Sequence, residues 1–134
     1  MPISKKTYPI ERILSAATYM TAGGVGFIWL VIAALSRKTV TKFLMYHILQ
    51  SIFLSILFVL ISFLGEMIYV ILYKIPLINA IPYLLSMPIS IFFGLSVIQL
   101  FTTVVILYLA ITSGMGYYSY LPWVSNIIKG NMGY

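Results

Sequence analysis

Three long apolar segments dominate the pattern of hydrophobic and polar positions along the chain. Residues 13–35 carry no charged side chain, residues 43–73 carry only Glu66, and residues 89–113 carry neither a charge nor a proline. At about 1.5 Å per residue, a helix over any of these segments is long enough to cross a hydrocarbon core of about 30 Å. We therefore expect three transmembrane helices.

The remaining apolar stretches are less suited to crossing. Three prolines divide residues 75–88, and proline removes a backbone donor and disfavours helix in the residue before it. We expect this stretch to be interfacial or re-entrant. Gly114 and Gly116 suit the C-terminus of the last long helix. The tail over 117–134 is rich in aromatic side chains that favour the headgroup level, which predicts an interfacial tail.

The pattern therefore predicts an all-α fold, a single polytopic membrane domain over 1–134. A four-span alternative divides the middle segment into helices over 43–64 and 67–87, but it places Lys74 and Asn79 at membrane depth, which is costly unless neighbouring protein receives them. We favour three crossings. That arrangement leaves four Lys or Arg on each side, so the sequence assigns no orientation.

Composition supports a lipid environment. The chain has 134 residues, of which 62% are hydrophobic and 7% are charged, whereas a soluble domain carries about 25% charged residues. The net charge is +6, but the basic residues stand in short clusters between apolar runs, which is not the basic stripe of a nucleic-acid-binding protein. There are no cysteines, which excludes disulfides and thiolate chemistry.

Polar side chains of the second apolar segment recur at helical spacing. At 100° per residue they fall on one arc, with Gln50 at its edge, and we expect this polar stripe to face protein, as a packing surface or a hydrophilic pathway. Its members are His47, Ser51, Ser55, Ser62, Glu66 and Tyr69, together with Gln50 at the edge. Ser96, Gln99 and Thr103 form a comparable group on the last segment, and we expect them to bond to the stripe.

The first segment carries a repeat of small residues. Thr18, Ala22 and Gly26 follow one another at intervals of four, which on one helix builds a ridge that permits close approach of another helix. We interpret this packing ridge as a contact for a neighbouring helix or subunit.

The inventory of reactive side chains argues against an enzyme. The chain contains one histidine, two glutamates and no aspartate. Acid and base catalysis, or a metal site, requires several such groups converging on one point. We therefore expect no catalytic residues, no metal and no cofactor. Glu66 is either solvated at an interface or buried and paired.

Three short segments carry a resemblance to a known family. They are ERILSAATY over 11–19, FLMYHILQS over 43–51 and LPWVS over 121–125. Together they resemble the Tic-twenty family, which includes a chloroplast inner-envelope import component and related bacterial membrane proteins. In this chain Met45 stands where the family has a basic residue, and one of the family's four usual helices is missing.

The resemblance implies a non-enzymatic membrane subunit that helps polypeptides cross a bilayer, with His47 and Gln50 at the family's motif positions. It implies other integral membrane subunits, membrane lipids and a translocating polypeptide as partners. The location it implies is a bacterial inner membrane or an organelle membrane such as the plastid inner envelope or thylakoid. The alternative is an accessory or structural subunit of a respiratory or photosynthetic membrane complex.

Overall fold

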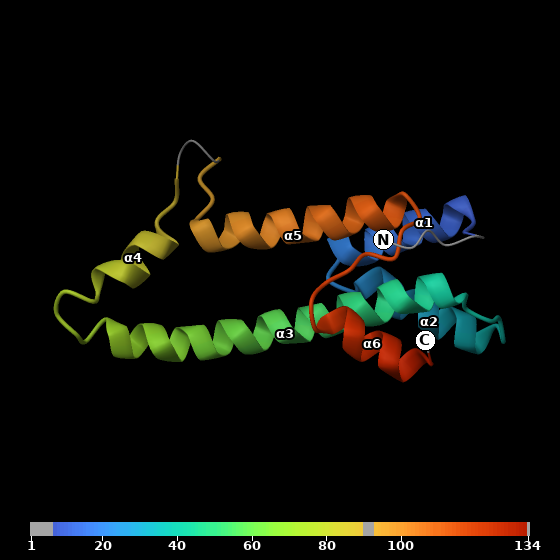
Figure 1. The fold of residues 1–134 in the computed structure, drawn as a ribbon, viewed down its shortest axis with the longest axis horizontal. Helices are drawn as coiled ribbons and strands as arrows, with labels where there is room; N and C mark the ends of the chain where they lie inside the picture. Colours follow the sequence, from blue (N-terminus) through green and yellow to red (C-terminus); the bar gives the residue numbers. More distant parts are fainter. Residues whose placement is uncertain (1–6, 90–92, 134) are drawn as a thin grey trace. The chain divides into compact units, whose positions relative to one another are not determined.

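A computed structural model describes residues 7–89 and 93–133, and in this part of the chain every regular element is a helix (Figure 1). The all-α class predicted from the sequence is thereby confirmed for the described residues. The helices are α1 (Pro9–Met20), α2 (Gly24–Leu35), α3 (Lys42–Leu72), α4 (Ala80–Ser86), α5 (Val97–Gly114) and α6 (Val124–Met132).

The chain divides into two compact units, each of which is described by itself. The first unit comprises residues 1–56 and 106–134, and the second comprises residues 57–105. Helices α3 and α5 each begin in one unit and end in the other.

The first apolar segment does not form the continuous helix expected over 13–35. Helix α1 ends at Met20 in a Schellman motif, in which the amide of Gly23 donates to the carbonyl of Thr18 at 2.8 Å. Ala22 and Gly23 have φ angles of 53° and 91°, in the left-handed region that glycine adopts freely. Helix α2 then packs against α1. An uncharged segment therefore does not guarantee one helix.

This break changes which helices can cross a membrane. Helices α1 and α2 have 12 residues each, or about 18 Å, which is shorter than a hydrocarbon core of about 30 Å. Helices α3, with 31 residues, and α5, with 18, are long and apolar enough to cross. Only 22% of the apolar window of each is buried, unlike the core helix of a soluble protein.

Helix α3 follows its predicted boundaries within one residue at each end. The hydroxyl of Thr41 accepts a hydrogen bond from the amide of Leu44 at 3.4 Å, at the start of the helix.

The stretch over 75–88, which was expected to be interfacial or re-entrant, contains the short helix α4. This helix ends before Pro88: Met87 is extended, which is the conformation that the residue before a proline prefers.

Helix α5 begins later than the predicted residue 89. Residues 90–92 of that expected helix lie outside the described residues, and Ile89 pairs with Leu95 in an isolated antiparallel bridge. The helix starts at a capping box: the amide of Gln99 donates to the hydroxyl of Ser96 at 3.3 Å, and the amide of Ser96 donates to the Gln99 side chain at 3.0 Å.

This capping box corrects the expectation that the polar group of α5 bonds to the stripe on α3. The hydroxyl of Thr103 donates to the backbone carbonyl of Gln99 at 2.8 Å, within the same helix. The hydrogen bonds of Ser96, Gln99 and Thr103 therefore stabilise the first turns of α5 itself.

The C-terminal end of α5 lies against α1. Gly116, with a φ angle of 87°, ends the helix, and the amide of Tyr117 donates to the carbonyl of Thr112 at 3.1 Å. A Cβ atom on Gly116 would lie 2.8 Å from Nε of Arg12, so the guanidinium rests directly on this glycine. A cation at this position also complements the negative end of the helix dipole.

The first unit buries many polar side chains beside an apolar core, and it leaves large apolar side chains exposed. Its buried polar side chains are Glu11, Ser15, Thr18, His47, Gln50, Ser51, Thr112, Ser113, Ser119 and Ser125. On the outside, Ile13, Met20 and Phe27 are 69%, 70% and 60% exposed. Water-soluble domains usually bury fewer polar side chains and expose fewer large apolar ones.

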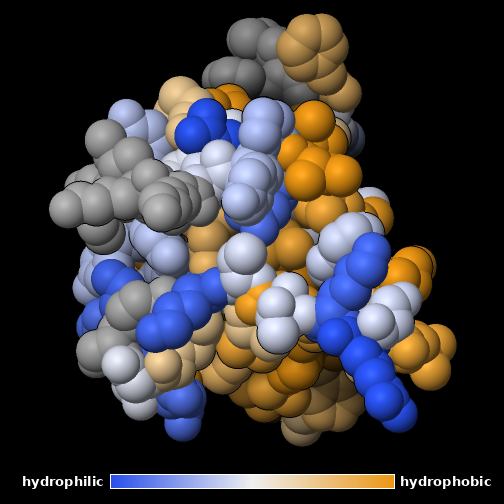
Figure 2. Space-filling view, turned by 90° about the vertical axis from the view of Figure 1, so that its right-hand side faces the viewer, coloured by the Kyte–Doolittle hydropathy of each residue, from blue (hydrophilic) through white to orange (hydrophobic). Residues whose placement is uncertain are grey.

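Charged residues gather at one end of the first unit. Figure 2 views this end and shows hydrophilic residues grouped there beside apolar ones. The start of α1, the end of α2 and the start of α3 lie at this end (Figure 1). It therefore carries Arg12, Arg37, Lys38 and Lys42, of which all but the half-buried Arg12 are exposed.

We predict that Gly26→Ala destabilises the first unit. A Cβ atom on Gly26 would lie 2.7 Å from Cγ2 of Thr18 and 2.9 Å from Cγ1 of Ile48, and both neighbours are fully buried. Overpacking of this kind costs about 1–3 kcal/mol. The measurement is the free energy of unfolding in mixed micelles. Gly130→Ala is the matched control, because a Cβ there meets no atom within 4 Å. Equal stability of the two variants would contradict the close approach.

Candidate functional site

His47 lies at the centre of the buried polar cluster of the first unit. Its Nε2 donates to the backbone carbonyl of Tyr117 at 3.0 Å, and its Nδ1 lies 2.8 Å from the hydroxyl of Tyr19. The same hydroxyl lies 3.0 Å from the side-chain amide of Gln50. One tyrosine of α1 therefore joins both motif residues of α3 and, through His47, the segment that follows α5.

The cluster extends from Gln50 to the start of α6. The Gln50 amide lies 3.2 Å from the hydroxyl of Ser125. This hydroxyl also accepts a hydrogen bond from the backbone amide of Leu121 at 2.8 Å. The hydroxyl of Tyr46 lies 2.8 Å from both the Ser125 hydroxyl and the Ser119 carbonyl. Side chains from α1, α3 and α6 thus share one hydrogen-bonded network, here called the polar cluster.

The proton count of this network links the charge of His47 to the orientation of the Gln50 amide. The Tyr19 hydroxyl has one proton and cannot donate to Gln50 and to His47 together. If it donates to Gln50, both ring nitrogens of His47 must carry protons and the imidazole is charged. If it donates to Nδ1, the imidazole is neutral and the amide NH₂ group faces Tyr19. Because no carboxylate takes part in the polar cluster, burial favours the neutral arrangement.

Aromatic rings enclose His47 from several directions. The rings of Phe43, Tyr46 and Tyr19 meet the imidazole edge to face, with centroid distances of 4.5, 5.2 and 5.6 Å. The ring of Tyr118 is stacked on it at 6.2 Å. The exposed fraction of His47 is 0%, so no substrate can reach the ring without rearrangement of this cage.

The serines of the polar stripe bond to the C-terminal end of α1. The hydroxyl of Ser51 donates to the carbonyl of Thr18 at 3.1 Å, and that of Ser55 donates to the carbonyl of Ala22 at 2.8 Å. The carbonyl of Thr18 also accepts the amide of Gly23, so the hydroxyl of Ser51 adds a second hydrogen bond to it from another helix. These two serines therefore join α3 to α1.

The structure brings together only part of the predicted stripe. His47, Gln50 and Ser51 are buried and Ser55 is half-buried, all in the first unit. Ser62 and Glu66 belong to the second unit, where both are exposed, and they do not join the polar cluster. The stripe divides because α3 continues past the end of the first unit.

The predicted packing ridge also takes another form. Thr18 lies on α1, Ala22 lies in the turn and Gly26 lies on α2, so the three do not form a ridge on one helix. Gly26 instead lies against Thr18, from which a Cβ atom would be separated by 2.7 Å. The small residues serve contact between α1, α2 and α3, within the chain.

Several members of the polar cluster were not among the predicted site residues. They are Tyr19, Tyr46, Tyr117, Ser119 and Ser125. Tyr19, Tyr46 and Ser125 lie inside the three segments that carry the family resemblance. Helical spacing within one segment could not reveal these residues, because their hydrogen-bond partners lie on other elements.

The polar cluster is chemically closed. In the described part of the chain, every buried side-chain nitrogen and oxygen has a hydrogen-bond partner. No group of three His, Cys, Asp or Glu side chains is placed to hold a metal ion within residues 7–89 and 93–133. The arrangement is suited to holding helices together, since its polar groups are already used by one another.

Comparisons of the chain with protein-family models, with curated proteins and with solved structures gave no match.

We predict that Tyr19→Phe destabilises the protein more than a tyrosine substitution on the surface. Loss of the hydroxyl leaves Nδ1 of His47 and the Gln50 amide without their shared partner, which costs about 1–3 kcal/mol. Tyr83→Phe is the control, because Tyr83 is 60% exposed. The free energy of unfolding of both variants measures the effect, and a loss no larger for Tyr19→Phe would refute the cluster's role.

Proposed function

We propose that the chain is an integral membrane protein that α3 and α5 anchor across the bilayer, and that it serves as a non-catalytic subunit of a larger membrane complex. The observation that carries this proposal is that α3 and α5 are long, apolar and largely exposed, while the buried polar side chains of the first unit are joined to one another. Hydrocarbon solvates exposed Ile, Phe and Met side chains at no cost, but it leaves an unpartnered serine or histidine unsatisfied. The buried polar side chains here are partnered.

The α1–α2 pair gives the proposal a membrane orientation. Because α2 turns back along α1, the basic residues before and after the pair lie at the same end of the first unit (Figure 1). That end carries Arg12, Arg37, Lys38 and Lys42, whereas Lys74 follows the opposite end of α3. The positive-inside rule places the first end on the cytoplasmic or equivalent side.

We predict that Arg37→Cys and Lys74→Cys react with a membrane-impermeant maleimide from opposite sides of sealed vesicles. The chain has no native cysteine, so each variant carries a single thiol. Inside-out vesicles should label the residue-37 thiol, and right-side-out vesicles the residue-74 thiol. Labelling of both from one side would contradict a crossing by α3.

The family resemblance supplies the process proposed for this subunit, which is movement of polypeptides across the bilayer. What supports it structurally is that the three segments over 11–19, 43–51 and 121–125 meet in the polar cluster, through Tyr19, His47, Gln50 and Ser125. Segments far apart in the sequence are thus parts of one physical unit. In this proposal the polar cluster keeps that unit rigid, and the apolar exterior contacts lipid, partner subunits and the passing polypeptide.

An accessory role in a respiratory or photosynthetic complex is the second candidate. The observation that favours it is the closed polar cluster, which offers no free polar group to a passing chain. In that case the exposed apolar faces of α2 and α3 contact fixed neighbouring subunits and lipid.

We predict that a photoreactive phenylalanine analogue at Phe27 captures a polypeptide stalled during translocation in the native membrane. Phe27 is 60% exposed on α2, whereas Phe43 is 2% exposed and serves as the buried control. The adduct should disappear when the stalled chain is released. One constant adduct, whether or not a chain is stalled, would contradict the transport role and support the accessory one.

A further inference from the structure

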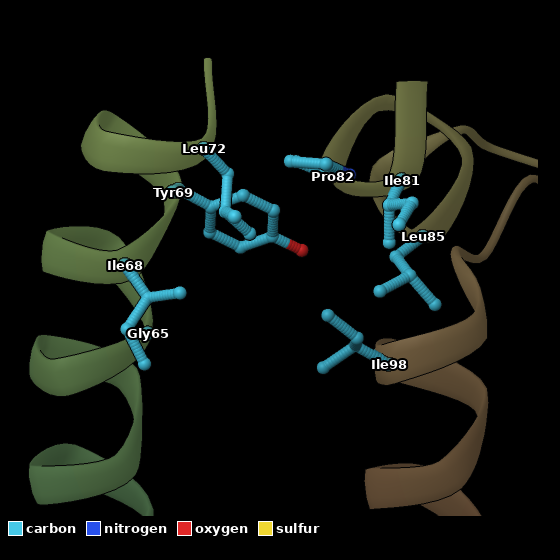
Figure 3. Close-up of a pocket in the computed structure, with 8 residues that line it drawn as sticks. All are labelled: Gly65, Ile68, Tyr69, Leu72, Ile81, Pro82, Leu85 and Ile98. Carbon is cyan, nitrogen blue, oxygen red and sulfur yellow. The ribbon is translucent and has the colours of Figure 1, made fainter. Parts of the chain in front are cut away.

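The second unit contains an apolar cavity of about 240 Å³ between three helices. Ile68 and Leu72 of α3, Ile81 and Leu85 of α4 and Ile98 of α5 point into it from both sides (Figure 3). An enclosed apolar cavity of about 150 Å³ is sufficient to bind benzene. This cavity is therefore large enough for a substantial part of a hydrocarbon chain.

One position in the α3 wall of the cavity has no side chain. Gly65 lines it from α3, and a Cβ atom built on Gly65 meets no atom within 4 Å. No neighbouring atom therefore requires a glycine at this position, and the absent side chain leaves part of the cavity empty. A larger residue can fill the cavity from this position without a clash, which makes the site testable.

A polar group marks one end of the cavity. The hydroxyl of Tyr69 points between α3 and α4 (Figure 3), and it accepts a hydrogen bond from Ser86 at 3.3 Å. Lys74 is exposed and follows the lining residue Leu72 by two positions. It is the one charged side chain between Glu66 and Lys129 in the sequence. Two hydroxyls therefore lie beside the cavity, and a cation follows in the chain two residues after the lining residue Leu72.

The cavity is also accessible from the apolar surface. Ile68, Ile81 and Ile98 are 55%, 53% and 47% exposed although they line it. A ligand can consequently enter from hydrocarbon without passing through water.

We propose that this cavity binds one acyl chain of an anionic phospholipid, whose phosphate is held by Lys74 and whose ester region lies at the hydroxyls of Tyr69 and Ser86. The apolar lining recognises the chain, and the charge of Lys74 selects an anionic over a zwitterionic headgroup. This inference rests on the membrane placement proposed above, since the chain must meet phospholipid from within a bilayer.

The test reconstitutes the full chain into phosphatidylcholine vesicles that contain a minority of phosphatidylglycerol with a diazirine on its acyl chain. After photolysis, mass spectrometry should locate the lipid on residues 65–85. Gly65→Leu should lower this adduct about tenfold, because the new side chain occupies the cavity. Lys74→Gln should lower capture of phosphatidylglycerol about fivefold and leave capture of diazirine-labelled phosphatidylcholine unchanged. Lys129→Gln is the matched charge control and should alter neither.

Three results would overturn the inference. Adduct formation that is equal in the wild type and Gly65→Leu would mean ordinary contact with surrounding lipid. Equal capture of both headgroups, unchanged by Lys74→Gln, would remove the anionic selectivity. Capture of a second copy of the chain at residues 65–85 in place of lipid would identify a protein contact.

Co-flotation with the vesicles separates failure of this inference from failure of the membrane placement. A chain that floats with lipid but gives no adduct at residues 65–85 rejects the lipid site alone. A chain that stays in the aqueous fraction rejects the membrane placement itself.

Discussion

The structure depends on one constraint, which is that buried polar groups must find their partners within the protein, and the proposed membrane placement leaves them no alternative partner. Tyr19, His47, Gln50 and Ser125 satisfy one another, and Ser51 satisfies a carbonyl at the end of α1. These bonds join α1, α3 and α6, and in the proposed membrane placement they do so where the hydrophobic effect is weak, since lipid is as apolar as the side chains it meets. The polar cluster is therefore what gives the first unit a defined arrangement.

How far the sequence predicts the fold differs between elements for physical reasons. Helix α3 was predicted within one residue at each end because length, apolarity and absence of proline agree over 42–72. The break after Met20 was missed because hydropathy does not register the left-handed conformation of Ala22 and Gly23. The start of α5 could have been found from the capping box that Ser96 and Gln99 form, a local signal within an otherwise apolar run.

In the candidate site, too, some features could be predicted from the sequence and others could not. Ser62 and Glu66 of the predicted stripe are exposed, whereas His47, Gln50 and Ser51 share one helical face and are buried. Their partners could not be predicted by spacing, since Tyr117 and Ser119 reach the cluster from an irregular segment after α5. The accessory and transport proposals share this scaffold and differ in what the apolar exterior contacts.

The most direct test of the account is the solvent around the exposed apolar side chains. The chain has no cysteine, so a nitroxide can be attached to single cysteines at Val59 of α3 and Phe101 of α5, which are 69% and 67% exposed. In reconstituted vesicles, electron paramagnetic resonance should show both nitroxides relaxed by oxygen and shielded from a water-soluble nickel complex. Strong relaxation of both by the nickel complex would contradict the account, because it would place water where the proposed membrane placement requires hydrocarbon.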